Sequence, residues 1–219
     1  MGKIIFVSGI DTDSGKTVAT GSIGRSLLNK GYSVITQKMV QTGCEGISTD
    51  IIIHRELMKT PLFEEDIDGT TCSYTFTFPC SPHLAARLQN TEIDLEIINQ
   101  STQKLLNSFD YVILEGAGGL HVPITSSANI IDYIQQKKIP LILVASAKLG
   151  SINHTLLSIE ACASRKIELL GVIFNSYPKT EQVIFDDSFH TISGFLEKMY
   201  PKSFMKILPQ IGENNEIDF

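Results

Sequence analysis

The chain has 219 residues, 42% of them hydrophobic and 19% charged, which is enough apolar material for a globular core. Its net charge of −6 argues against a nucleic-acid-binding surface, because such surfaces are usually basic. The longest nearly apolar run, IPLILVASA, is about half of a membrane span, and the N-terminus lacks a signal-peptide pattern. We therefore expect a cytoplasmic protein whose partners include neither nucleic acid nor membrane.

Apolar runs of strand length alternate with helical stretches along the chain. The pattern predicts strands over residues 3–9, 32–38, 110–116, 139–146, 168–175 and 202–209, with a short strand within 71–78. Helices are predicted over 15–31, over 48–58 and between the later strands. Strands that are apolar on both faces and alternate with helices indicate a parallel sheet covered on both sides. No repeat or linker divides the chain, so we expect one doubly wound, mostly parallel α/β domain of the P-loop NTPase type over residues 1–219.

The first predicted strand leads into VSGIDTDSGKT, which ends in Gly15, Lys16 and Thr17. A loop between a strand and a helix can direct backbone N–H groups at a phosphate. In such loops the lysine reaches the β- and γ-phosphates, and the hydroxyl binds Mg²⁺. The nearest upstream glycine, Gly9, lies one residue earlier than the usual G-x-x-x-x-G-K-[ST] spacing allows. The strand–loop–helix context nevertheless favours a phosphate loop over an ordinary helix start with an exposed lysine.

The next strands also end in charged residues. Lys38 ends the strand over 32–38, and Glu115 follows an apolar run like a Walker B acid. Ligands of doubly wound sheets bind at the carboxyl ends of the strands. This placement argues against the alternative that Lys38 is only a solvated strand-end residue.

Asp50 opens the helix predicted over 48–58 and has two possible roles. It is either a first-turn acid that interacts with the helix dipole or part of a metal site. Thr17, Asp50 and Glu115 together offer hard oxygen ligands of the kind that Mg²⁺ takes beside phosphates. The five histidines form no ligand set, and we expect surface, capping or local-contact roles for His54, His83, His121, His154 and His190.

Several motifs in order resemble the dethiobiotin synthetase family: GIDTDSGKT, QKMVQTG, PCSPH, LEGAGG, AKLGSINH and the asparagine of VIFNS. They run from residue 9 to residue 176. The family's loop has the pattern G-x-D-T-x-x-G-K-T, so its first glycine is displaced as in this chain. The resemblance implies that the unusual spacing is a family trait.

The resemblance also implies a reaction. The family condenses 7,8-diaminononanoate with CO₂ (or bicarbonate) to form dethiobiotin, with ATP as co-substrate and Mg²⁺ as cofactor. The substrate forms a carbamate, which ATP converts into a carbamic–phosphoric mixed anhydride, and ring closure follows. ADP and phosphate are released. Positioning and charge stabilisation are the main tasks of the protein in such chemistry.

Matching positions imply roles for individual residues. Lys16 and Lys38 would be catalytic, and Thr17, Asp50 and Glu115 would hold Mg²⁺. The implied nucleotide-binding residues are Asp13, Ser14, Gly15, Lys16, Thr17, Val18, Asp50, Glu115, Gly116, Ala117, Gly118, Asn175 and Ser176. The implied substrate-binding residues are Lys38, Thr42, Gly150, Ser151, Ile152 and Asn153. The last four would bind the substrate carboxylate across the interface of a homodimer.

The chain departs from the family pattern at a few positions. Ile10 stands where threonine is frequent, and Met39 replaces a proline. After Pro209 the chain stops within GENNEIDF, whereas relatives usually continue into a further helix near the base. We expect weaker base discrimination as a result, with GTP or CTP tolerated more than in typical relatives.

A ParA/MinD-like ATPase switch is the main alternative, because that class shares the fold and the Gly-Lys-Thr. It carries a signature lysine five residues before the loop lysine, where this chain has Asp11. Another ring- or amide-forming ligase of the same fold is a second alternative.

Overall fold

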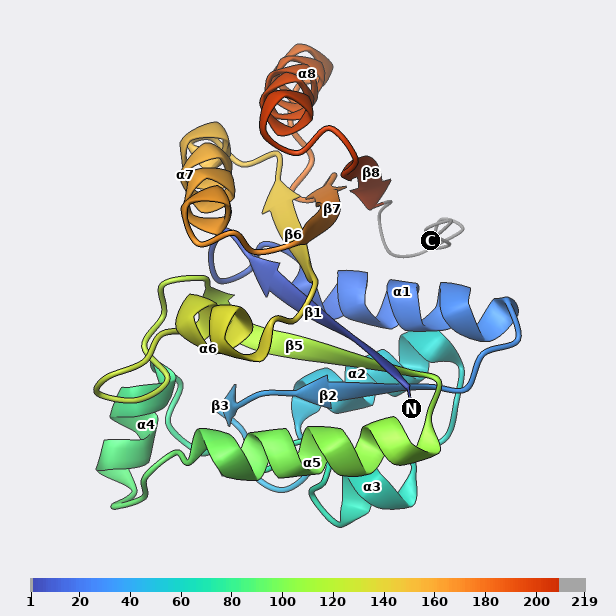
Figure 1. The fold of residues 1–219 in the computed structure, drawn as a ribbon, viewed down its shortest axis with the longest axis vertical. Coiled ribbons are helices and arrows are strands. Elements are labelled where there is room, and N and C mark those ends of the chain that lie inside the picture. The colour runs from blue at the N-terminus through green and yellow to red at the C-terminus, as the bar shows by residue number, and fades with distance from the viewer. Residues whose placement is uncertain (1, 209–219) are drawn as a thin grey trace.

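The computed structural model describes residues 2–208, and its centre is a six-stranded parallel sheet with the order β2-β5-β1-β6-β7-β8 (Figure 1). The strands are β1 (Lys3–Gly9), β2 (Val34–Lys38), β5 (Tyr111–Gly119), β6 (Leu141–Ser146), β7 (Leu169–Asn175) and β8 (Phe204–Leu208). A separate two-stranded sheet pairs β3 (Gln41–Thr42) with β4 (Thr75–Phe76). The helices are α1 (Lys16–Asn29), α2 (Thr49–Met58), α3 (Glu64–Ile67), α4 (Pro82–Leu88), α5 (Leu95–Ser108), α6 (Ile130–Lys137), α7 (Ser151–Ser164) and α8 (Gln182–Met199).

The strand and helix predictions are confirmed along the main sheet, with two differences. The segment 71–78 contributes only two residues of ladder, and it pairs outside the main sheet with β3. Strand β5 continues three residues beyond residue 116, because Gly119 still pairs with Gly9 after a register shift in which β5 carries the extra residues. The glycines after Glu115 therefore extend the strand instead of ending it.

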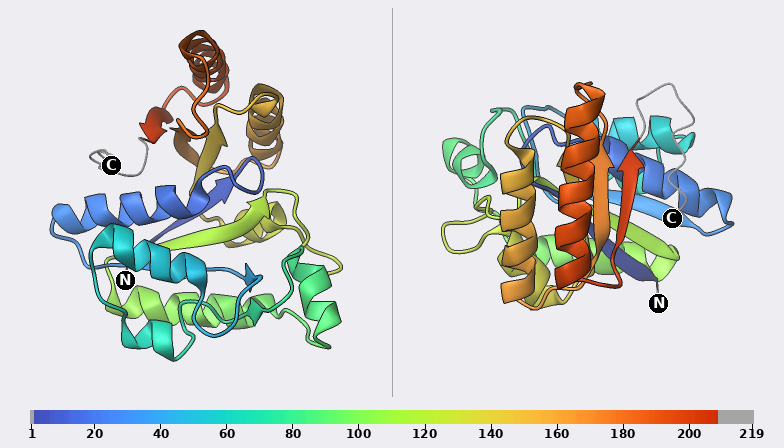
Figure 2. Two further views of the ribbon diagram at one scale, coloured as in Figure 1. Left: turned by 180° about the vertical axis from the view of Figure 1, so that it is seen from behind. Right: turned by 90° about the horizontal axis from the view of Figure 1, so that it is seen from above.

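The sheet is covered on both faces, as side-chain alternation along β1 shows. Ile5 and Val7 contact a core formed mainly with α1, whereas Phe6 contacts the core on the opposite face. Helices α6, α7 and α8 contribute to that opposite core, and α7 and α8 lie side by side in Figures 1 and 2. This arrangement confirms the predicted α/β fold with helices on both faces.

Close packing of α1 on α2 determines where α2 lies. A Cβ atom at Gly21 would lie 2.7 Å from Leu57 Cδ1, and one at Gly24 would lie 2.9 Å from Met58 Sδ. A larger residue at either position would force the α2 side chains to shift. The contact holds α2 beside β2, with its first turn at the end of that strand.

Three further observations bear on the expectations from sequence. No helix within residues 2–208 is both long enough and apolar enough to cross a membrane. The four cysteines, Cys44, Cys72, Cys80 and Cys162, carry free thiols. Pro209 and the segment after it lie outside the described residues, so weaker base discrimination stays a prediction.

Candidate active site

The predicted site residues meet because three parallel strands end at the same edge. Strand β5 lies between β2 and β1, and Lys38 of β2 is the direct neighbour of Glu115 on β5. On its other side, Glu115 is paired with Val7, two residues before the start of the phosphate loop. Parallel strands bring their carboxyl ends together, which is why residues 31 to 108 positions apart in the sequence converge here.

The phosphate loop connects β1 to α1 through two residues in the left-handed backbone region. Asp13 has φ +59° and Gly15 has φ +99°. A Cβ atom at Gly15 would lie 2.4 Å from Asn175 Nδ2, so this position requires glycine. Gly15 is also the N-cap of α1 and offers no side chain to its first turn. The first-turn N–H groups are therefore open to an anion.

Lys16 lies on the inner side of this loop. Its Nζ donates to the Asp11 carbonyl oxygen at 2.9 Å, and the side chain is buried. Burial and repulsion by Lys38 lower its pKa to about 8, and the carboxylates of Glu115, Asp50 and Asp11 only partly offset them. The buried ammonium group of Lys16 beside the phosphate loop suits a site for a bound anion.

Lys38 is held between two carboxylates. Its Nζ lies 2.5 Å from Asp50 Oδ2 and 2.7 Å from Glu115 Oε1, and it donates to the Gly116 carbonyl oxygen at 3.1 Å. Burial lowers the pKa of Lys38, but attraction by Glu115 and Asp50 outweighs burial and raises the pKa above its ordinary value. The solvated strand-end alternative is wrong, because this side chain is buried and doubly paired.

Glu115 is fully buried, and each of its oxygens has partners of its own. Oε1 accepts hydrogen bonds from Lys38 Nζ and, at 3.3 Å, from Thr17 Oγ1. Oε2 lies 2.7 Å from His54 Nε2. Burial alone would raise the pKa of Glu115, but the charge of Lys38 and the bond from His54 lower it below its usual range. The carboxylate is therefore ionised.

Asp50 lies in the first turn of α2, two residues after the N-cap Ser48, which fits the first of the two roles left open by the sequence. It also forms an ion pair with Lys38, and its part in a metal site stays a prediction. Gln41 of β3 helps to hold this turn, because its Oε1 accepts from Ser48 Oγ at 2.6 Å.

Sequence reasoning missed the part that His54 and Arg55 play. The expected local-contact role of His54 is confirmed only in the broadest sense, since its ring is fully buried against Glu115 and Thr36. Arg55 binds Asp66 in a bidentate pair, with distances of 2.7 and 2.8 Å. The four-residue spacing of Asp50 and His54 could have suggested a shared helix face. Only packing reveals that this face is the buried one.

The oxygen donors fit magnesium when phosphates complete the site. Thr17 Oγ1 and Glu115 Oε1 are adjacent, and Asp50 joins them through the Lys38 ammonium group. Mg²⁺ commonly takes one or two carboxylates together with phosphate oxygens and water. Within residues 2–208 no group of three or more His, Cys, Asp and Glu side chains could hold a metal on its own. A cation here would therefore depend on the nucleotide.

Asn175, at the end of β7, touches the phosphate loop. Its Nδ2 donates to the Ser14 carbonyl oxygen at 3.1 Å, and its Oδ1 accepts from the Tyr177 backbone at 3.0 Å. Ser176 is turned toward β8, where its hydroxyl donates to the Leu208 carbonyl oxygen at 2.9 Å. The structure brings Asn175, but not the Ser176 hydroxyl, to the loop.

The start of α7 forms another part of the same edge. Gly150, with φ +91°, precedes the helix, and the Ser151 hydroxyl donates to the Ser146 carbonyl oxygen. Asn153 is exposed. Because β1 lies between β5 and β6, these residues are on the opposite side of the phosphate loop from Lys38.

A groove of about 640 Å³ opens beside the start of α7. We call it the α7–α8 groove, and its lining residues are Ala147, Lys148, Leu149, Gly150, Ile152, Asn153, Val183, Ile184, Asp187 and Ser188. Thr42, the remaining predicted substrate residue, lies half-buried on β3. The predicted substrate residues therefore lie on two sides of the edge.

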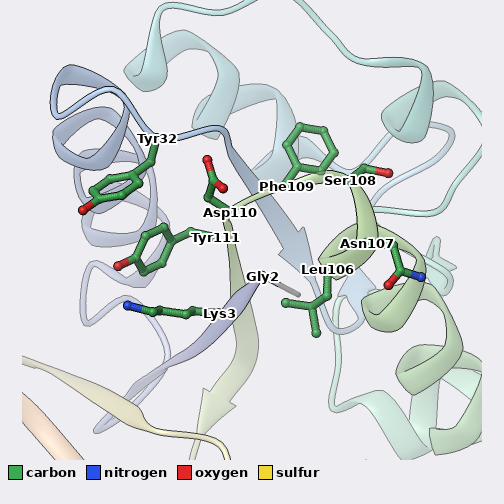
Figure 3. Close-up of a pocket in the computed structure, with 9 residues that line it drawn as sticks. All are labelled: Gly2, Lys3, Tyr32, Leu106, Asn107, Ser108, Phe109, Asp110 and Tyr111. Atoms are coloured by element: carbon green, nitrogen blue, oxygen red, sulfur yellow. The ribbon is translucent and has the colours of Figure 1, made fainter.

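A second pocket lies at the opposite ends of the strands (Figure 3). Asp110 lines it, but this carboxylate already accepts from the Ser33 backbone and hydroxyl, each at 2.8 Å. The rings of Tyr32 and Tyr111 pack edge to face there, with centroids 5.1 Å apart. Its polar groups serve the packing of the amino ends, so it is a weaker candidate than the carboxyl edge.

Comparison with known proteins agrees with this geometry. A family model described as an AAA domain matches residues 3–213. The chain is 55% identical over 184 residues to ATP-dependent dethiobiotin synthetase BioD 2 of Haemophilus influenzae, covering 84% of this chain and 96% of that protein. It is 47% identical over 197 residues to ATP-dependent dethiobiotin synthetase BioD of Chlorobaculum tepidum, covering 90% and 82% of the two chains.

More distant likeness concerns the fold alone. The MinD cell division protein of Aquifex aeolicus superposes with a TM-score of 0.56 at 15% identity, covering 97% of this chain and 84% of that one. The pNOB8 ParA bound to nonspecific DNA gives 0.57 at 13% identity, covering 100% and 88%. These similarities confirm the P-loop NTPase-like fold. On the sequence matches, the chain belongs to the dethiobiotin synthetase family of AAA-domain proteins.

Proposed function

We propose that the chain, as a member of this family, catalyses the ATP-dependent formation of dethiobiotin from 7,8-diaminononanoate and CO₂. The observation that carries the proposal is the buried ammonium group of Lys38, held between Asp50 and Glu115 beside the phosphate loop. The reaction joins a carbamate anion to the γ-phosphoryl group of ATP. Two anions that approach one another require fixed positive charge, which Lys16 and Lys38 supply.

The chemistry has three steps. One amine of the substrate adds to CO₂ and loses a proton, which leaves a carbamate. A carbamate oxygen then attacks the γ-phosphorus, the bond to ADP breaks, and a carbamic–phosphoric anhydride forms. Finally, the second amine attacks the carbonyl carbon and closes the ring, the bond to phosphate breaks, and the attacking nitrogen loses a proton. The protein accelerates these steps by orientation and charge.

The phosphate loop accounts for the first part of this work. The N–H groups of the first turn of α1, together with Lys16, would bind the β- and γ-phosphates. Lys38 would receive the carbamate. Because two carboxylates keep Lys38 protonated, it acts as a fixed charge and not as a base.

Thr17, Asp50 and Glu115 would hold Mg²⁺ with the help of phosphate oxygens. Magnesium held there would neutralise charge on the phosphates. Asn175 matches the family's adenine contact and would contact the base from the end of β7, where it also bonds the loop residue Ser14.

The other half of the site is proposed to need a second copy of the chain. The start of α7, from Gly150 to Asn153, would bind the substrate carboxylate of the neighbouring subunit, since a helix N-terminus favours an anion. The exposed apolar side chains beside it, Leu149 and Val183, fit an interface in a homodimer. The Thr42 hydroxyl would complete the substrate contacts, and the protein would work in the cytoplasm.

Phosphate release by the purified protein tests the proposal. The assay contains Mg-ATP, bicarbonate and 7,8-diaminononanoate, with each component omitted in turn. We expect release only from the complete mixture, with dethiobiotin detected by mass spectrometry. Parallel assays with GTP test the predicted weak base discrimination, and a strong preference for ATP would contradict it.

The same assay distinguishes the proposed ligase from the ParA/MinD-like alternative. ATP hydrolysis that ignores the diamine and yields no ring product would favour an ATPase switch. The ParA/MinD-like alternative is supported only by likeness of fold, and no contact within residues 2–208 favours it over a ligase.

A further inference from the structure

The buried ring of His54 contacts Oε2 of Glu115, whereas Thr17 and Lys38 bond the other oxygen, Oε1. We infer that His54 is a positioning residue, which holds Glu115 so that Oε1 alone is presented to Thr17 and Lys38. The inference deepens the proposed function and rests on it, since it concerns how this chain prepares Glu115 for Mg-ATP.

Helix α2 supplies a further partner to each member of the Lys38–Glu115 pair. Asp50 and His54 are four residues apart and lie on the same face of the helix, where Asp50 meets Lys38 and His54 meets Glu115. On the sheet, Lys38 and Glu115 are direct neighbours in register. The first and second turns of α2 therefore hold the last residue pair of β2 and β5 in place.

The hydrogen-bond directions around His54 are consistent along the whole chain of contacts. Arg55 can only donate, and its Nη1 donates to Thr36 Oγ1 at 2.8 Å. The Glu115 carboxylate can only accept, so His54 Nε2, 2.7 Å away, is the donor to Oε2. The Thr36 hydroxyl lies 3.0 Å from His54 Nδ1 and can donate to that nitrogen. A ring with its proton on Nε2 therefore satisfies all three groups.

Loss of the His54 donor would leave Glu115 Oε2 buried without its partner. The carboxylate would then rotate toward the ammonium group of Lys38, and Oε1 would move away from Thr17. Partners that orient a metal-binding carboxylate typically change metal affinity about 10- to 100-fold when they are removed. The effect should therefore appear in the magnesium dependence of ATP binding.

The test uses His54→Leu, which removes the donor, and His54→Gln, whose side-chain amide can donate from nearly the same position. Binding of ATP is measured by calorimetry over a series of Mg²⁺ concentrations and also in excess EDTA. We expect His54→Leu to raise the Mg²⁺ midpoint about 10- to 100-fold. Binding in EDTA should change little, and His54→Gln should restore most of the magnesium effect.

Thr102→Val is the matched control, because it removes a buried hydroxyl that bonds Gln37 at 2.8 Å on the other face of β2. It should lower stability without moving the Mg²⁺ midpoint. An unchanged midpoint in His54→Leu, or an equal shift in the control, would overturn the inference.

The wild-type protein gives an independent readout. A variant is needed only to assign the His54 signals. Nitrogen NMR distinguishes histidine tautomers, and the His54 signals are those lost in His54→Gln. We expect the Nε2–H form, and an Nδ1–H form would overturn the inference. A wild-type protein that turns over substrate while His54→Leu keeps its magnesium response refutes only the inference. A wild-type protein without magnesium-dependent ATP binding refutes the proposed function as well.

Discussion

The end of β2 and β5 and the α7–α8 groove lie on the same edge of the sheet but differ in how they are built. In the first region Lys38, His54 and Glu115 are buried and bonded to one another. In the groove Leu149 is 93% exposed and Val183 is 72% exposed. One region is complete within a single chain, and the other presents apolar surface outward.

The difference follows from the cost of burying charge. A buried ion without a partner destabilises a protein strongly, so the charged region must supply its partners from within the fold. Exposed apolar groups carry no such requirement, and they gain stability only when another surface covers them. The charged region therefore has its partners within the chain, whereas the apolar side chains of the groove would gain stability only if another surface covered them.

Replacing Lys16 tests whether the charged region carries the chemistry. We expect Lys16→Met to lower kcat/KM for dethiobiotin formation about 10³-fold, because a positive group aimed at the transferring phosphoryl would be lost. Steady-state kinetics would measure the effect. Lys104→Met removes a lysine that is exposed at the surface and should change the rate less than about twofold. A loss below tenfold for Lys16→Met would contradict this prediction.

Arg55 tests how strongly the fold depends on paired buried charge. Arg55→Met leaves Asp66 buried without its bidentate partner, and we expect a loss of about 3–5 kcal/mol in the free energy of unfolding. Urea denaturation would measure it. The exposed Lys104–Asp68 pair provides the contrast, since its removal should cost less than about 1 kcal/mol. Equal losses of unfolding free energy at the two sites would contradict the expected difference between buried and exposed ion pairs.

Leu149 tests the other side of the comparison. If the groove is a dimer interface, Leu149→Glu should weaken association about 10- to 100-fold, or about 1.4–2.8 kcal/mol. Sedimentation velocity at several concentrations would show the change, and binding of Mg-ATP should persist. Ile67→Glu changes another exposed apolar side chain, on α3, and should leave association unaltered. Unchanged sedimentation of Leu149→Glu would count against this interface.

Acid pH provides a smaller effect within the buried region. Burial would raise the pKa of Asp66, but the hydrogen bonds and charge of Arg55 outweigh it and lower the pKa below the ordinary value of 3.8. The stabilisation is therefore present above the unfolded-state pKa and is lost as pH falls through the lower, folded-state value. Chemical unfolding at falling pH should show a steeper loss for the wild type than for Asp66→Asn. Parallel plots of unfolding free energy against pH for the two proteins would show that Asp66 makes no such contribution.

Much of the site was predictable because its signals are local. The Gly15-Lys16-Thr17 ending, the apolar run before Glu115 and the position of Lys38 can each be recognised without a structure. The rule that parallel strands bring their carboxyl ends together then predicts their proximity. The short pairing of 71–78 was not predictable, because alternating residues do not say which strand they will join.

The sequence by itself determined the order of strands and helices, the phosphate loop and the membership of the family, because these depend on residue types and spacings along the chain. Only the tertiary structure decided that His54 and Arg55 face inward and that the charge of Lys38 is shared between Asp50 and Glu115. The physical reason is that packing against other elements decides which face of a helix is buried. Gly21 and Gly24 let α2 approach α1, and that contact turns polar side chains of α2 onto the sheet.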